Sequence, residues 1–136
     1  MKFNINSELP HKYMLDRINL NRIPGISTLS YVSNDTDHLT NKITVLAFRV
    51  AYIIGAVFPI SKFNININVY EHHKPLDYWF ERKTKTIHLY RKFTEKILAH
   101  ELCHALLHIT FEGKMRKGTQ EILCIYADKH LRDRRV

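Results

Sequence analysis

The chain has few cysteines, no apolar leader segment and no hydrophobic run long enough to span a membrane. Only two of the 136 residues are cysteines, Cys103 and Cys124, which is too few for a disulfide framework. Residues 1–8 contain no apolar core of a secretory signal. The longest apolar run, residues 43–58, is short and contains Arg49, so it predicts a buried helix and no membrane association. These absences favour a cytoplasmic protein with reduced thiols.

Acidic residues are also scarce relative to basic ones. The chain has 21 lysines and arginines against 13 aspartates and glutamates, which gives a formal net charge of +8. The positive charge is concentrated in residues 82–96 and after residue 113. Such a surplus favours an acidic partner, either a protein or DNA, although no recognised nucleic-acid motif accompanies it. A solvated basic surface explains the same surplus.

The length and the hydrophobic content predict a single globular domain over residues 1–136. Hydrophobic residues make up 45% of the chain, which is sufficient for a buried core. Residues 1–40 are polar, and we expect a loosely structured amino-terminal extension there with one short helix near 11–20. The next periodic segment predicts a helix over 41–57, with Thr40 or Asn41 as its cap.

The second half of the chain predicts a small sheet and two helices. Residues 63–70 alternate apolar side chains with asparagine, as in a strand with one buried face. Residues 78–82 and 86–90 flank a charged turn and predict a hairpin. Helices are expected over 94–109, capped by Thr94, and from 119 to about 132, with a loop between them. The result is an α+β domain with a small antiparallel sheet.

Residues 100–104 read His-Glu-Leu-Cys-His and lie within the helix predicted over 94–109. Residues four apart are one turn apart on the same helix face, so His100 and His104 can direct both imidazoles at one metal ion, with Glu101 beside them. Two neutral nitrogen ligands and a carboxylate that takes a proton from a metal-bound water are the arrangement of zinc hydrolases. The alternative is a surface helix with solvated side chains.

A catalytic zinc ion usually has three protein ligands, so another segment must supply one. We expect Glu121, because the loop before it contains glycines that let the chain double back. Asp128 can then accept a hydrogen bond from a ligand imidazole. The alternative ligands are, in order, Asp128, His130 and Cys124, and Glu121 can instead only complement the helix dipole.

The remaining histidines and one tyrosine have secondary roles in this scheme. His108 is about 12 Å along the helix axis from His100, so it is expected to pack or hydrogen-bond near the site without binding the same ion. Tyr126 or His88 can assist at the oxyanion, and the sequence does not choose between them. His72 and His73 have no ligand spacing to the motif.

Residues 86–109, which contain the motif, resemble the core of the zincin metallopeptidases, and in particular the ImmA/IrrE family of small bacterial and phage proteases. His100 and His104 match the zinc ligands of that family, Glu101 matches its catalytic base, and Glu121 is the nearest match to its glutamate ligand. The resemblance implies a minimal zincin-like fold, a bound Zn²⁺ and a cytoplasmic protease that cuts a regulatory protein, often a DNA-bound repressor.

The motif helix also resembles that of the DNA-associated SprT/Spartan proteases, whose third ligand is a histidine, for which His130 is the available residue. Three functions therefore follow from the sequence. The first is a zinc metallopeptidase, with the strand over 86–90 as the edge on which a peptide docks. The second is a regulatory module with a zincin fold and little turnover. The third is a basic nucleic-acid-binding protein in which the motif is incidental.

Overall fold

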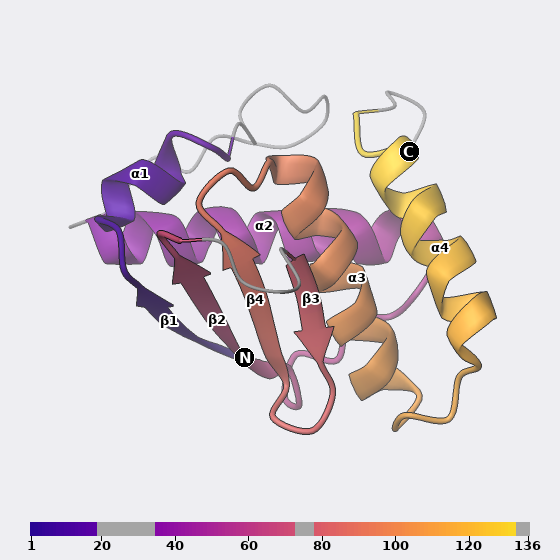
Figure 1. Ribbon diagram of the computed structural model, residues 1–136. Coiled ribbons are helices and arrows are strands. Elements are labelled where there is room, and N and C mark those ends of the chain that lie inside the picture. The colour runs from indigo at the N-terminus through magenta and orange to yellow at the C-terminus, as the bar shows by residue number, and fades with distance from the viewer. Residues whose placement is uncertain (19–34, 73–77, 133–136) are drawn as a thin grey trace.

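The computed structural model describes residues 1–18, 35–72 and 78–132 and combines four strands with four helices (Figure 1). This confirms the α+β prediction. Residues 19–20 of the helix predicted near 11–20, and His73, lie outside the described residues. In chain order the elements are β1 (Lys2–Ser7), α1 (His11–Leu15), α2 (Asp35–Ile54), β2 (Asn64–Tyr70), β3 (Tyr78–Glu81), β4 (Thr86–Tyr90), α3 (Glu95–Thr110) and α4 (Lys117–Lys129).

The four strands form one sheet in the order β1-β2-β4-β3. β1 pairs parallel to β2, β2 pairs parallel to β4, and only β3 and β4 are antiparallel. The prediction of an antiparallel sheet is therefore wrong, although the β3–β4 hairpin is confirmed. β4 lies inside the sheet, so the expectation that residues 86–90 offer a docking edge is also wrong. The outer strand on that side is β3.

Two parallel pairings cause the error: β2 pairs with β4, and β2 also pairs with β1, which we expected to be part of a loose extension. Phe3 and Ile5 pair in register with Ile65 and Ile67 of β2, a contact between segments about sixty residues apart. Such a pairing leaves no local pattern beyond two alternating apolar residues. β1 therefore joins the sheet as an edge strand.

Strand β2 shows the alternation that the sequence predicts. Ile65, Ile67 and Val69 are buried under the helices, while the asparagines between them lie on the opposite face. The asparagines pair across the two strands: Asn4 Nδ2 donates to Asn66 Oδ1 at 3.0 Å, and the next pair along, Asn6 and Asn68, makes the same bond at 3.2 Å. Side-chain amides thus satisfy one another on the face away from the core.

Helix α2 runs behind the sheet, across the strands (Figure 1). It begins at Asp35, six residues before the predicted start, because the buried stripe of Ile43, Leu46 and Val50 extends back to Leu39. It ends at Ile54 and not at residue 57. Gly55 there adopts a φ of +72°, and the amide of Ala56 donates to the carbonyl of Ala51, a glycine-terminated helix end.

Helix α3 confirms the helix predicted over 94–109. Thr94 caps its start, with its side-chain oxygen accepting from the amide of Ile97 at 3.2 Å. The stripe that includes Leu98, Leu102 and Ala105 is buried in the core, which fixes the rotation of the helix. Helix α4 packs against α3 and begins two residues before the predicted start. Within the described ranges, no helix combines the length and apolar character that crossing a membrane requires.

Candidate metal centre

Four electron-rich atoms from helices α3 and α4 converge at one point. The Nε2 atoms of His100 and His104 are 3.2 Å apart. Glu121 places Oε1 3.0 Å from Nε2 of His100 and Oε2 3.0 Å from Nε2 of His104. Because α3 is anchored by its buried stripe, both imidazoles are directed away from the core and toward α4. The structure thus brings together the three residues that the sequence singles out as metal ligands.

The other ring nitrogens show how each imidazole is oriented. Nδ1 of His100 lies 2.7 Å from Oδ2 of Asp128, and Nδ1 of His104 lies 2.6 Å from Oε1 of Gln120. A carboxylate oxygen and an amide oxygen can accept a hydrogen bond from Nδ1, and a neutral ring that donates from Nδ1 offers its Nε2 lone pair to a metal ion. Two nitrogen lone pairs and two carboxylate oxygens then face one another, an arrangement that a cation between them stabilises.

The separations agree with the dimensions of a zinc site. In a tetrahedral site with bonds of about 2.0–2.1 Å, neighbouring ligand atoms lie roughly 3.3 Å apart. The three separations among His100, His104 and Glu121 are 3.0–3.2 Å. His100, Glu101 and His104 also present ligand atoms within 4.8 Å of one another. This donor set fits Zn²⁺, and imidazole with carboxylate suits other divalent transition metals too.

Glu101 lies beside this centre but is buried, with 7% of its surface exposed. Its Oε2 atom has no hydrogen-bond partner among the described residues. Burial raises the pKa of Glu101 from its ordinary value of 4.5 to about 7, with a smaller opposing effect from His100 and a smaller raising effect from Glu121. A carboxyl group with a pKa near neutrality can both accept and return a proton, which is the requirement for a general base.

This pKa shift predicts a pH-dependent stability difference between the metal-free protein and its Glu101→Gln variant. The folded state binds the Glu101 proton more tightly than the unfolded state, so ionisation destabilises the fold as pH rises from 4.5 to 7. The variant has no carboxyl group to ionise at this position, so its folded state is not destabilised in this way. Its advantage in free energy of unfolding should grow across that window and reach up to about 3 kcal/mol at pH 8. Urea unfolding with chelator at pH 5 and pH 8 measures it, and a constant difference at both pH values would contradict the shift.

The centre opens into a cleft of about 510 Å³. The histidines, Glu101 and Glu121 lie on one side, and residues of the outer strand β3 lie on the other. The side chain of Glu121 is 49% exposed, so the centre is accessible from the cleft. The β3 residues in the cleft lining are Tyr78, Trp79 and Phe80.

Asp128 lies near the centre because of its spacing on α4. It follows Glu121 by seven residues, close to two helical turns, so both carboxylates are on the same face of the helix. Glu121 meets the Nε2 atoms, while Asp128 meets Nδ1 of His100. Asp128 is thus placed as a hydrogen-bond acceptor for the ligand ring and not as an alternative ligand.

Tyr126 and His130 are directed elsewhere. Their rings contact each other at a tilt of 38° with centroids 4.3 Å apart, and Tyr126 is 46% exposed. Tyr126 follows Glu121 by five residues, which places it about 140° around the helix from the cleft. Neither residue lines the cleft, so the expected oxyanion role of Tyr126 and the ligand role of His130 have no support in the geometry.

His108 and His88 also lie away from the centre. The ring of His108 packs edge-on against Phe80, and burial, with Arg82 nearby, lowers its pKa. His108 thus packs near the site without joining the metal centre, as expected, but it is no direct partner of a ligand imidazole, because Asp128 and Gln120 hold the two Nδ1 atoms. His88 is bonded to Tyr70 and Glu81 and stacks on Trp79, and it is not in the cleft lining.

Cys124 is buried in the interface between α3 and α4 together with Cys103. A hydrogen bond with Cys103 and burial raise the pKa of the Cys124 thiol well above its ordinary value. A metal ligand must be a thiolate, so this environment disfavours Cys124 as the third ligand.

Gln120, the hydrogen-bond partner of His104, was not predicted from the sequence. It is 3% exposed, although glutamine is usually found on the surface. Its position next to Glu121 is the only signal in the sequence, because periodicity does not separate a buried glutamine at a helix start from an exposed one.

Replacement of Gln120 by leucine should weaken zinc binding 10–100-fold, because the His104 ring loses the acceptor that holds its orientation. Gln120→Glu keeps an acceptor oxygen and should retain most of the affinity. Competition with a chromophoric zinc chelator measures both variants. Equal affinity of the leucine variant and the unmodified protein would show that Gln120 does not orient the ligand.

Comparisons of the chain with protein-family models, with curated proteins and with solved structures found no match.

Proposed function

We propose that this protein is a zinc-dependent metallopeptidase that hydrolyses peptide bonds of a protein substrate. The observation that carries the proposal is the convergence of the Nε2 atoms of two imidazoles and one carboxylate beside the buried Glu101, at the wall of an open cleft. His100, His104 and Glu121 would hold the ion. A bound Zn²⁺ supplies Lewis-acid chemistry, in which it polarises a carbonyl and lowers the pKa of a bound water.

The residues around the ion have distinct tasks in this mechanism. Asp128 and Gln120 hold the two ligand rings in the tautomer that leaves Nε2 free. Glu101 accepts the proton of the attacking water and returns it to the leaving amine. Its burial supports this role, since a raised pKa lets the carboxyl group pass the proton on near neutral pH.

The outer strand β3 gives a peptide substrate a place to bind. It ends the sheet on the side of the cleft, so its outer backbone groups face no other described strand. An extended peptide can add to such an edge through backbone hydrogen bonds. Because Tyr78 and Phe80 line the same cleft as Glu101, a peptide on this edge passes the metal centre.

The geometry supports the ImmA/IrrE-like interpretation over the SprT-like one. Glu121 contacts both imidazoles, whereas His130 contacts Tyr126 outside the cleft lining. A glutamate therefore supplies the third ligand in this proposal.

The test is cleavage of an unstructured peptide mixture by the zinc-loaded protein, with products identified by mass spectrometry. Cleavage should stop when a chelator removes the metal and return when Zn²⁺ is restored. Cleavage that persists in chelator would show a different origin of the activity, and no cleavage with a full equivalent of zinc would contradict the proposal.

A further inference from the structure

The cleft beside the metal centre continues on its other side. A second cavity of about 350 Å³ adjoins the first and shares Tyr78, His100 and Glu101 with it. The two cavities form a groove, here called the β3 groove, that passes the metal centre along strand β3. A substrate bound along β3 would therefore contact residues on both sides of the bond to be cut.

The acidic residues of the β3 groove all belong to the metal centre or lie beside it. They are Glu101, Glu121 and Asp128. Glu121 and Asp128 contact the two ligand histidines, and Glu101 is buried beside them. None of these carboxylates is available to balance a positive charge elsewhere in the groove.

The basic residues of the β3 groove are unoccupied. They are Arg82 and Lys117 in the larger cavity and Lys96 in the smaller one. Within the described part of the chain, their side-chain nitrogens form no ion pair or hydrogen bond. Three unpaired cations thus lie in the groove wall, on either side of a centre that would add the charge of a metal ion.

The positions of these cations match the reach of a short peptide. Arg82 directly follows β3, and the stretch from Tyr78 to Arg82 extends about 13 Å in a strand. Lys96 precedes His100 by four residues on α3 and so lies about 6 Å along the helix axis from it. An extended peptide of five residues covers the same length as the stretch of β3 from Tyr78 to Arg82.

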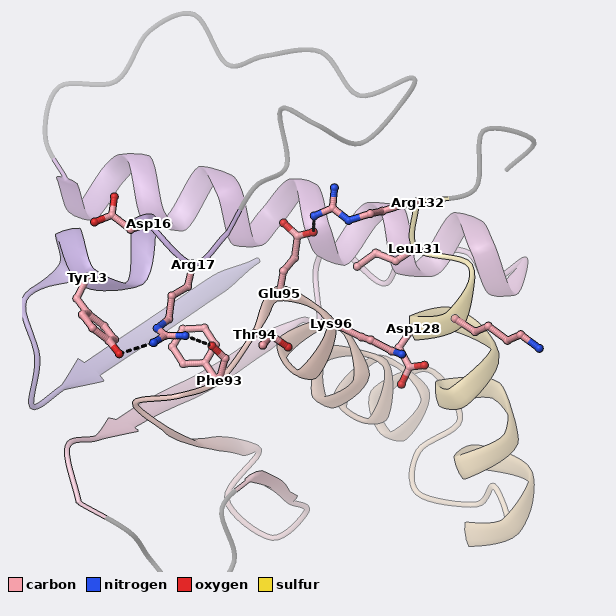
Figure 2. A pocket seen from close by; sticks show the side chains of 11 residues that line it. Tyr13, Asp16, Arg17, Phe93, Thr94, Glu95, Lys96, Asp128, Leu131 and Arg132 are labelled. Carbon is pink, nitrogen blue, oxygen red and sulfur yellow. Dashed lines mark hydrogen bonds and ion pairs between the residues drawn. The ribbon is translucent and has the colours of Figure 1, made fainter.

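A larger cavity of about 770 Å³ lies beyond Lys96 and Asp128, both of which it shares with the smaller cavity (Figure 2). Its arginines are engaged: Arg132 pairs with Glu95 at 2.8 Å, and Arg17 donates to the carbonyl of Phe93 at 2.8 Å. The arginines of this larger cavity therefore add no unpaired charge to the β3 groove.

We propose that the β3 groove recognises acidic peptide segments, with Arg82 and Lys117 contacting carboxylates on one side of the scissile bond and Lys96 on the other. This inference rests on the proposed function for the position of the bond. An acidic peptide is favoured over DNA because the strand edge offers backbone hydrogen bonds that an extended polypeptide satisfies and a phosphate backbone does not.

Binding and cleavage are measured separately. The zinc-loaded Glu101→Gln protein, in which turnover is blocked, is titrated with labelled peptides of equal length that are rich in Asp and Glu, in Asn and Gln, or in Lys. The acidic peptide should bind at least tenfold more tightly than the neutral one at low salt, and the difference should shrink as salt rises. In the unmodified protein, cleavage sites in a random peptide mixture should be enriched in flanking Asp and Glu.

Charge reversal identifies the residues responsible. Arg82→Glu with Lys117→Glu should lower the preference for the acidic peptide roughly tenfold, mainly through KM in cleavage, while zinc content stays at one equivalent. The matched control is Lys12→Glu with Lys62→Glu, which changes net charge equally on exposed side chains outside the groove lining. It should keep the preference.

Each contrary result has its own meaning. Equal binding of acidic and neutral peptides, or equal loss in the control pair, would overturn the inference. A DNA oligonucleotide that binds more tightly than the acidic peptide, and only when Arg82 and Lys117 are intact, would make the groove a nucleic-acid surface and also overturn it. Selective binding without cleavage of any peptide would uphold the inference while contradicting the proposed peptidase activity.

Discussion

Replacement of Glu101 by glutamine is expected to lower kcat for peptide hydrolysis about 10²–10⁴-fold while the protein keeps one equivalent of zinc. Glutamine has nearly the same shape but cannot accept the proton of the attacking water. Glu101 points its Oε2 atom to no partner among the described residues, so its carboxyl group has no structural hydrogen bond at that atom to lose. Steady-state kinetics and metal analysis of the same samples test both parts of the prediction.

The matched control is Glu112→Gln, the same chemical change on a side chain that is 67% exposed. It should leave both turnover and zinc content unchanged. If the protein is a regulatory module with the same fold and little turnover, the unmodified protein, Glu101→Gln and Glu112→Gln should all show little or no cleavage. If verified cleavage survives in Glu101→Gln with unchanged kcat, Glu101 is not the general base.

Replacement of Glu121 by alanine is expected to weaken zinc binding by more than the 10–100-fold typical of losing a hydrogen-bond partner of a ligand. Glu121 is the only described residue whose carboxylate contacts the Nε2 atoms of both imidazoles. Without it, two imidazoles and solvent hold the ion, and the stabilisation that saturating zinc gives to the folded protein falls by about 1.4 kcal/mol for each tenfold loss of affinity. Thermal unfolding with and without Zn²⁺, together with chelator competition, measures the loss.

The other candidate ligands provide the comparison. Asp128→Asn keeps an acceptor near His100 and should cost less affinity than Glu121→Ala. His130→Ala and Cys124→Ser should leave affinity unchanged, since neither side chain contacts the ligand nitrogens. If Glu121→Ala keeps full zinc affinity and one of the other variants loses it, the third ligand is the residue replaced in that other variant.

The local parts of the fold were predictable from the sequence. The placement of His100 and His104 needs only a helix, and Thr94 together with the apolar stripe predicts where that helix begins and which face is buried. The alternation in β2 and the charged turn between β3 and β4 are likewise patterns within a few residues. These elements agree with the predictions because their determinants lie within the segments themselves.

The features of the fold and the site that the sequence did not predict depend on contacts between distant segments. Strand β1 is held by pairing with β2, and the early start of α2 depends on burial of Leu39 in a core built from the whole chain. The hydrogen bond between Gln120 and His104 depends on how α4 packs across α3. Tyr126 is different, because its angle from Glu121 follows from helical periodicity alone and argued against a role in the cleft.

X-ray absorption at the zinc edge of the metal-loaded protein is the most direct test of the proposed centre. The account predicts one zinc ion with two imidazole nitrogens and carboxylate or water oxygens at about 2.0–2.2 Å, and no sulfur. A shell of sulfur near 2.3 Å would place Cys103 or Cys124 at the metal. That result, or a failure to bind zinc at all, would contradict a centre built from His100, His104 and Glu121.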